Sequence, residues 1–571
     1  MNRKRAAAPG AVLVAVLLVA LFGFASTGKA EGAPQPPVTL QIMGFADRAE
    51  PDGIHQNPVA KYIQDKLGIT MDFTVVADGD GSDQKVSALI ASDDLPDICM
   101  FYTKDNILNA KKAGIITPLD DLLARYGTNT MKDKLGRAMV LMMKKTYGAD
   151  DGKTWAYGMA KGTYDNGMGP LVANWIRWDL YKKIGYPAIN SDDDLLNALA
   201  KMQAAEPTTV EGNKVYAMGL WSDWGTWNLT YKPWFTEGIM SLSIPGMYYN
   251  LSTNSLLGVL PASDPKNGLW RSARFFNKAK QMGILDPESF TQKYDVWNTK
   301  ATTGQYLWIE PGWVVNEANK YFDKVNAPQK GFASLPPYNT DAWALITLQT
   351  IGERPYVISK KSQHPDRAMQ LLDWLGSYEG SFVVYNGPEG NLWNLVNGVP
   401  TPTQEYLKAT VDKDFEKTTG AQLYNHFMGY FYATIDPTSG VAVDLYNDSP
   451  QAAAIRYSRP IFKDMLDHYK VKDFRTLYTR NLKAYNSDGI LLNALPDLPP
   501  DLKTQAVDAL TFETNQLNKA MIANSDAEFK QAMDEYTAGI GKYPLDAIFK
   551  LRQQQAADAT QKYKDVFDLL K

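Results

Sequence analysis

The fold is decided early in the chain, by residues 38 to 77, which read VTLQIMGFADRAEPDGIHQNPVAKYIQDKLGITMDFTVVA. Apolar residues alternate over 38–44, as they do in a strand with one buried face. Asn57 and Pro58 then supply an N-cap and a first-turn proline for a helix, which a glycine can end. Residues 69–77 again have the composition of a strand. Two strands joined by one helix predict parallel pairing with a right-handed crossover, and hence an α/β lobe.

The same alternation of strands and helices continues through most of the chain. Ser191 with Asp194 and Ser525 with Glu528 have the spacing of capping boxes, which predicts that a helix begins at each serine. From about residue 405 the pattern is mainly helical. No repeat of 20 to 50 residues recurs, so a solenoid or propeller is not expected. Further strands are predicted within 150–159, 304–313 and 355–359.

Residues 1–30 have the features of a secretory signal peptide. Basic residues at 3 to 5 precede an apolar run over 11–25, and small residues flank Lys29 at a cleavage point after Ala30. The apolar run is shorter than the roughly 18 to 20 residues that span a bilayer. A retained membrane anchor is the alternative interpretation.

Charge and cysteine content restrict the partners and the compartment. The 59 basic and 63 acidic residues give a net charge of −4, and cleavage after Ala30 would remove four basic residues and no acidic one. A nucleic-acid partner is therefore not expected. The single cysteine, Cys99, can form no internal disulfide and is no lipid-attachment site, and we expect an inert thiol in the core. An unanchored exported protein needs an outer barrier to stay with its cell, which favours the periplasm.

Several segments, taken together, are similar in sequence and in order to those of one known family. Each fragment alone is a weak signal, but their order over much of the chain is a strong one. The segments are DLPDI (94–98), NWIRWDLYKKIGYPAINSDDDLLNAL (174–199), FFNKAKQMGILDPESFTQ (275–292), HPDRAMQLLDWLGSYEG (364–380) and YNGPEGNLWNLVNG (385–398).

On these segments the chain resembles the extracellular solute-binding proteins of family 1, the capture subunits of ABC importers. It is most similar to the large oligosaccharide-binding members, including the alginate-binding and lipoprotein-A-like branches. The resemblance runs from about residue 38 to 400 and more weakly to the end. It implies a type II periplasmic-binding-protein fold of two α/β lobes, each with a doubly wound sheet, which close over a ligand. It also implies an oligosaccharide ligand, permease subunits as partners and no cofactor, and we expect a monomer.

The resemblance also suggests how the chain is divided between the lobes. We expect the first lobe to use residues 38–165 and 308–355. The second lobe would use 166–307 and 356–571, including a helical C-terminal extension.

One segment departs from the family. Many large relatives carry a calcium loop of the form D-x-N-G-x-G-x-x-D-E, whereas residues 204–219 here read AAEPTTVEGNKVYAMG. Glu206 and Glu211 alone cannot supply the six to eight oxygen ligands that calcium takes. We therefore predict no bound calcium here and assign no metal-ligating residue, while a calcium site elsewhere in the chain is left open.

Aromatic residues are the main candidates for ligand contact. A sugar ring presents C–H bonds on its faces and hydroxyls at its edge, so it suits flat indoles together with polar side chains. The chain has 14 tryptophans, and four of them lie in WSDWGTWNLTYKPWF (221–235). A glycine and a proline there predict irregular backbone. We expect Trp224 or Trp227 to contact the ligand and Trp221 and Trp234 to be core, while packing of the whole group is the alternative.

Trp313 is the best single candidate outside that stretch. It follows the strand-and-turn WIEPG, where the family places an aromatic as the chain re-enters the first lobe, so we expect it to face Trp224 and Trp227 across a cleft. Asp47 and Arg48 follow the first strand, whose carboxyl end should face the same cleft. The remaining candidates, for which packing, solvated loops or hinge salt bridges are the alternatives, are Arg177, Trp178, Arg354, Glu389, Trp393, Tyr430, Phe431 and Tyr432.

A secreted glycoside hydrolase or polysaccharide lyase is the competing class of protein. A glycosidase needs two carboxylates about 5 to 10 Å apart, which sequence spacing cannot exclude. The four histidines are scattered, and no HExxH, GxSxG or P-loop motif occurs. The order of the family segments favours a binding protein, so we assign no catalytic residue.

The identity of the glycan is not readable from the sequence. The excess of aromatic residues favours neutral sugars such as those of plant cell walls. Arg48, Arg177 and Arg354 leave acidic oligosaccharides open, because a guanidinium pairs well with a carboxylate.

Overall fold

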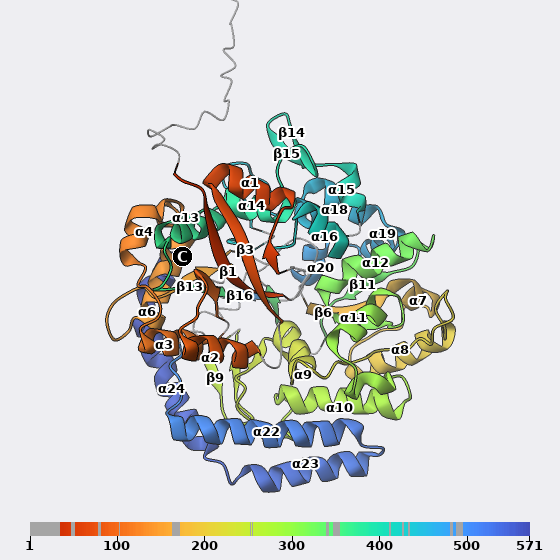
Figure 1. Ribbon diagram of the computed structural model, residues 1–571. Coiled ribbons are helices and arrows are strands. Elements are labelled where there is room, and N and C mark those ends of the chain that lie inside the picture. Colours follow the sequence, from red (N-terminus) through yellow and green to blue (C-terminus); the bar gives the residue numbers. More distant parts are fainter. Residues whose placement is uncertain are drawn as a thin grey trace, which may run out of the picture. The chain divides into compact units, whose positions relative to one another are not determined.

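A computed structural model shows how helices and sheets are combined in the chain (Figure 1). The chain divides into two units, Met1–Pro37 and Val38–Lys571, and the description below concerns the second. The predicted signal peptide, Asp47, Arg48 and Tyr432 lie outside the described residues. The described residues are 35–46, 52–77, 82–101, 103–162, 172–251, 253, 255–338, 342–345, 354–409, 411, 413–424, 427–431, 434–479, 483–486 and 495–570.

The opening strand–helix–strand prediction is confirmed. Strand β1 (Val38–Ala46) pairs in parallel with β3 (Ile69–Ala77) along its whole length, and α1 (Pro58–Leu67) lies between them in the chain. Asn57 caps α1 by accepting a hydrogen bond from a backbone N–H of the first turn at 2.9 Å. Gly68 ends the helix in the left-handed conformation, with φ of 65°.

These strands belong to a six-stranded sheet in the order β2-β3-β1-β4-β13-β5. Strand β4 is parallel to β1, whereas β13 is antiparallel to both β4 and β5. Apolar side chains of the sheet and its helices form what we call the first core, which includes Ile42, Phe73, Met139, Tyr356 and Leu372. The further elements here are β2 (Gly53–Ile54), β4 (Ile98–Met100), β5 (Tyr157–Met159), β13 (Arg354–Ile358), α2 (Ser82–Ser92), α3 (Lys104–Ala113), α4 (Asp120–Tyr126), α5 (Thr128–Lys132), α6 (Lys134–Tyr147), α13 (Pro365–Leu375) and α14 (Tyr378–Asn386).

A second, three-stranded sheet has β6 at its centre, antiparallel to β10 on one side and β11 on the other. Its apolar side chains and those of the surrounding helices form the second core, which includes Trp175, Leu199, Phe276, Trp308 and Phe332. The elements are β6 (Val172–Arg177), β10 (Trp308–Pro311), β11 (Phe332–Leu335), α7 (Trp178–Lys183), α8 (Asp192–Ala205), α9 (Trp227–Tyr231), α10 (Gly268–Gln281), α11 (Tyr294–Thr302) and α12 (Val315–Lys324).

The expected division of the chain between lobes is wrong in its later part. Residues 308–335 were expected in the first lobe, but β10 and β11 both pair with β6 and pack in the second core. Residues 356–375 were expected in the second lobe, but β13 pairs with β4 and β5, and α13 packs in the first core. The second sheet is also small and antiparallel, not doubly wound as expected.

The predicted helical C-terminal region is present. Helices α22 and α23 lie side by side (Figure 1). The Glu528 N–H donates to Ser525 Oγ at 3.2 Å, so the expected cap of α23 is confirmed. Leu517 and Phe529 of this pair are buried in the second core, whereas Tyr563 and Val566 are buried in the first. The helices are α22 (Pro500–Ile522), α23 (Asp526–Ile540), α24 (Leu545–Lys562) and α25 (Lys564–Leu570).

Smaller elements connect these parts. None of the described helices combines the length and the apolar character that crossing a bilayer requires. The smaller sheets are formed by β7 (Ile239–Ser241), β8 (Tyr248–Asn250) and β9 (Ser255–Leu257), by β12 (Ala342–Leu345) and β16 (Lys483–Asn486), and by β14 (Trp393–Val396) and β15 (Val399–Pro402). The short helices between β15 and α22 are α15 (Gln404–Lys408), α16 (Lys413–Thr419), α17 (Leu445–Asp448), α18 (Pro450–Ser458), α19 (Pro460–Tyr469) and α20 (Phe474–Thr479).

Candidate functional site

The three most exposed aromatic side chains among the described residues are all tryptophans of one cluster. Trp224 is 36% exposed, Trp227 is 43% exposed and Trp313 is 38% exposed. We call these three side chains the indole surface. Because a soluble protein normally covers such large apolar rings, their exposure in one place marks a surface that is suited to binding.

Two tyrosines hold the indole surface together. The Trp224 ring stacks on Tyr294 with centroids 4.2 Å apart, and the Trp313 indole N–H donates to the Tyr294 hydroxyl at 2.7 Å. The ring of Tyr231 lies 5.5 Å from that of Trp227 and 5.8 Å from that of Trp313. Tyr294 and Tyr231 therefore link all three indoles and limit their freedom to rotate.

The local sequence explains why Trp224 and Trp227 face outward. The Asp223 carboxylate accepts the Tyr294 N–H at 3.0 Å, which ties the tryptophan loop to the start of α11. Gly225 has φ of 55° with open space around it, so the turn needs glycine for its backbone conformation. Trp227 then opens α9, and a π-helical turn follows at Lys232–Thr236, a feature that is frequent at functional sites.

The two other tryptophans of the stretch lie deeper. Trp221 is buried and its ring lies 4.4 Å from that of Trp297, so the prediction that it belongs to the core is confirmed. Trp234 is half-buried and packs against the second core. The cluster is therefore part core and part surface.

Trp313 lies on the same core as Trp224 and Trp227. It belongs to a short 3₁₀ turn, Gly312–Val314, that joins β10 to α12, and Val314 is buried in the second core. The expectation that Trp313 faces the other two indoles from the opposite lobe is wrong, because β10 is a strand of the second sheet.

A buried polar group lies beside the indole surface. Glu310, at the end of β10, is only 6% exposed and forms no hydrogen bond or ion pair with any residue that the structure describes. Burial raises the pKa of Glu310 to about 8, with Lys232 opposing and Asp192 adding to the shift. Lys232 is ion-paired with Asp192, and the Tyr338 hydroxyl donates to the same carboxylate at 3.0 Å.

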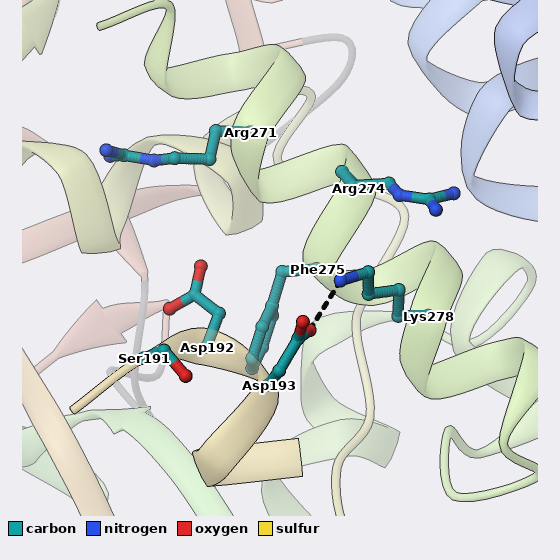
Figure 2. A pocket seen from close by; sticks show the side chains of 7 residues that line it. All are labelled: Ser191, Asp192, Asp193, Arg271, Arg274, Phe275 and Lys278. Carbon is teal, nitrogen blue, oxygen red and sulfur yellow. Dashed lines mark hydrogen bonds and ion pairs between the residues drawn. The ribbon is translucent and has the colours of Figure 1, made fainter. Parts of the chain in front are cut away.

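A hollow of about 250 Å³ opens between the start of α8 and one face of α10 (Figure 2). Lys278 is paired with Asp193 across it at 2.5 Å, whereas Arg271 and Arg274 point away from each other, toward Glu237 and Asp526. The lining offers no exposed aromatic face, and its cations already have carboxylate partners, so we do not assign a sugar site here. The lining residues are Ser191, Asp192, Asp193, Arg271, Arg274, Phe275 and Lys278.

Comparison with known families identifies the kind of protein. Residues 49–381 match the family described as bacterial extracellular solute-binding protein. The chain belongs to this family. None of the curated protein sequences matches it significantly.

Solved structures of other solute-binding proteins share the fold. The alginate-binding protein AlgQ2, solved without calcium ion, is 16% identical, covers 91% of this chain and 98% of its own, and has a TM-score of 0.59. An HMO-binding solute-binding protein from Bifidobacterium longum infantis is 15% identical, with coverages of 93% and 99% and a TM-score of 0.61. FusA from S. pneumoniae, in complex with kestose, is 14% identical, with coverages of 92% and 100% and a TM-score of 0.62.

Two predicted site residues of the solute-binding protein are buried at the start of α7. Arg177 is ion-paired with Asp179 and Glu206, each at 2.8 Å, and the Trp178 indole N–H donates to Asp464 at 2.8 Å. Both side chains are fully buried. Their contacts are those of packing and internal ion pairs, so we leave them out of the binding surface.

Trp393 and Glu389 stabilise the β14–β15 hairpin. The Trp393 ring packs edge-on against Phe382 at 4.9 Å, and its indole N–H donates to the Gly387 carbonyl at 3.0 Å. Glu389 accepts the Leu395 N–H at 3.2 Å. Trp393 is buried and so offers no face to a sugar.

Tyr430 and Phe431 are buried as well. Tyr430 stacks on Tyr378 with centroids 4.1 Å apart, and the Lys161 ammonium lies 4.5 Å from the Tyr430 ring. The aromatic wall expected here is therefore internal packing. Arg354 is half-buried at the start of β13, and its role in ligand binding stays a prediction.

Glu206 and Glu211 lie in the segment where many relatives carry a calcium loop, and here both carboxylates have protein partners. Glu206 is ion-paired with Arg177 and Lys330, and Glu211 accepts a hydrogen bond from the Tyr321 hydroxyl. Within the described ranges, no three His, Cys, Asp or Glu side chains are grouped to hold a metal ion. Cys99 is buried, and this burial raises the pKa of its thiol well above the usual range.

Three residues of the site were not found by sequence reasoning. Tyr231 and Tyr294 are two of 31 tyrosines, and nothing in the sequence shows that they meet the indoles. Glu310 could have been noticed, because it is a carboxylate inside the apolar strand WIEP, where burying a charged residue costs free energy.

Proposed function

We propose that this solute-binding protein captures an oligosaccharide on the indole surface and delivers it to the permease subunits of an ABC importer. The observation that carries the proposal is the exposure of Trp224, Trp227 and Trp313 in one tyrosine-supported group. Each indole can cover the C–H face of one sugar ring, so a group of three suits linked sugars better than a monosaccharide.

The names of structurally similar proteins support the same class of ligand. They bind alginate, HMO and kestose according to their descriptions. Together with the predicted signal peptide, membership of an extracellular family supports a periplasmic location and a role in uptake rather than catalysis. The two cores would close over the ligand, with the protein acting as a monomer.

Binding can be tested with a panel of oligosaccharides. Thermal-shift screening would find the sugars that stabilise the protein, and calorimetry would measure their affinity. Chromatography after incubation should return the sugar intact, whereas product formation would overturn the proposal in favour of an enzyme.

The site itself is tested by Trp224→Ala and Trp313→Ala. Each should weaken sugar binding about tenfold or more, because a desolvated aromatic contact is typically worth about 1.4 kcal/mol or more. Leu395→Ala is a matched control, since Leu395 is also 38% exposed but lies in the β14–β15 hairpin. Unchanged affinity in both tryptophan variants would refute the assigned surface.

A further inference from the structure

Glu310 is a nearly buried carboxyl group without a hydrogen-bond partner among the described residues. Buried polar groups normally have partners, because an unpaired one costs about 1 to 3 kcal/mol or more, so an exception needs an explanation. An apolar residue at this position would avoid the cost of burying a carboxyl group. A group that lacks a partner in the unliganded protein can gain one from the ligand.

The position of Glu310 connects it to the indole surface. It is the last residue but one of β10, the strand from which the chain turns into Trp313. Its charge also acts on Tyr231, the residue on which Trp227 and Trp313 pack. Glu310 therefore belongs to the support of the indole surface and not to a distant part of the core.

We propose that the Glu310 carboxyl is a hydrogen-bonding group of the binding site, and that it selects neutral oligosaccharides over glycans that carry carboxylates. This inference rests on the proposed function. A carboxylate accepts hydrogen bonds from sugar hydroxyls, and such charge-assisted bonds are the strong ones. Once ionised, above its pKa of about 8, Glu310 has no donor and gives an ionised uronic acid nothing to bind, whereas the protonated carboxyl keeps one O–H donor, so the selection applies at high pH.

The charges around Glu310 favour the same selection. The groups that act on it or respond to it are Lys232, Asp192, Tyr231 and Tyr338. Lys232, the single cation among them, is already ion-paired with Asp192. An ionised Glu310 thus leaves an excess of negative charge, which repels a carboxylate on the ligand and is weakly screened because the group is buried.

The proposal makes binding depend on pH. Because burial holds the pKa of Glu310 near 8, the carboxyl of the free protein is mostly protonated at pH 6 to 7. A sugar hydroxyl that donates to it favours the ionised form, so binding should lower this pKa and release a proton. The affinity for a neutral oligosaccharide should therefore rise as the pH increases from 6 to 9, by up to about tenfold per pH unit below the pKa of the free protein.

The experiment uses the full-length mature protein and two groups of probes. The neutral group contains gluco-, xylo- and fructo-oligosaccharides, and the acidic group contains oligogalacturonates and alginate oligomers. The neutral sugar that gives the largest thermal shift is then titrated by calorimetry at pH 6, 7, 8 and 9. At pH 7, titrations in phosphate and in Tris, which differ in ionisation enthalpy, give the number of protons released.

In the wild type we expect a preference for the neutral group at pH 9, where Glu310 is ionised, together with release of up to one proton and tighter binding of neutral sugars at high pH. Glu310→Gln keeps the shape of the side chain but cannot titrate. It should abolish both the proton release and the pH dependence, weaken neutral sugars about tenfold at pH 9 and reduce the discrimination against acidic ones. The control Glu405→Gln removes an exposed carboxylate on α15 and should behave as the wild type.

The outcomes separate this inference from the proposed function. Binding of no oligosaccharide at all refutes the proposed function, and the inference with it. Sugar binding that depends on Trp313 but shows no proton release, takes up a proton or is unaltered in a folded Glu310→Gln variant refutes the role of Glu310 alone. A wild-type preference for the acidic group at pH 9 also refutes it.

Discussion

At the scale of single residues, Tyr294 contacts two of the three tryptophans of the indole surface. Its ring supports Trp224 by stacking, while its hydroxyl accepts the indole N–H of Trp313 at 2.7 Å. Tyr294→Phe removes only the hydroxyl, so we expect sugar affinity to fall about two- to tenfold, the usual worth of one hydrogen bond. Tyr294→Ala also removes the stacked ring and should cost more. Calorimetry measures both, and an equal loss in the two variants would contradict the stacking role.

The chemistry of sugars allowed some of the binding residues to be predicted from the sequence. Other candidates with the same chemistry proved to be buried, which the sequence alone does not show. Trp224, Trp227 and Trp313 were found because indoles in irregular segments suit sugar faces. Trp178 and Trp393 have the same chemistry, but each is buried and its indole N–H bonds to a protein oxygen. Those oxygens belong to Asp464 and Gly387, and only the fold brings the first of them near.

At the scale of elements, helix α22 carries a carboxyl group, Glu513, that is buried inside the protein. Glu513 is fully buried, and its polar neighbours among the described residues include Tyr536 and Trp270, which lie too far off ideal geometry to form full hydrogen bonds with it. Burial raises its pKa to about 7, with Tyr536 and Trp270 nearby opposing the shift. Since the folded form holds this proton more tightly than the unfolded chain, the contribution of Glu513 to stability is greatest at low pH and falls as the pH rises to about 7.

Glu513→Gln should therefore flatten the dependence of stability on pH. Between the unfolded carboxyl pKa of about 4.3 and pH 7, Glu513 lowers the free energy of unfolding by about 1.4 kcal/mol per pH unit. Glu310 contributes a fall of the same sign, so the quantity to compare is the difference between variant and wild type in urea denaturation at each pH. Asp508→Asn, an exposed change on α22, is the control. A difference that does not vary with pH would contradict this assignment.

Elements set by local signals were predictable, and pairings between distant segments were not. The N-caps at Asn57, Ser191 and Ser525 mark helix starts because each side chain bonds a backbone N–H of its own first turn. Strands β10 and β13 were also recognised as strands. Their partners lie more than a hundred residues away, and pairing between such distant strands leaves no local pattern in the sequence. The lobe assignment failed for this reason, and with it the side on which Trp313 was expected.

At the scale of the whole molecule, the late helices join the two cores. Helices α22 and α23 bury Leu517 and Phe529 in the second core, while Tyr563 and Val566, near the chain end, are buried in the first. We call these two pairs of buried residues, Leu517 with Phe529 and Tyr563 with Val566, the two anchors of the helical region. Helix α24 connects them, and its Leu545 and Ile548 belong to a smaller apolar cluster with residues of α22. A relative movement of the cores during ligand capture must therefore be accommodated by this helical region.

The two anchors should be separable by mutation. Tyr563 is buried against α6, where its hydroxyl lies 3.2 Å from that of Thr146, and Tyr563→Ala should cost about 3 kcal/mol or more of local stability. Hydrogen exchange should then become faster in α25 and the end of α24, because their contacts with the first core are lost. Helices α22 and α23 should remain protected, since Leu517 and Phe529 still hold them to the second core. If all four helices lose protection together, the region is one cooperative unit, and two independent anchors are the wrong description.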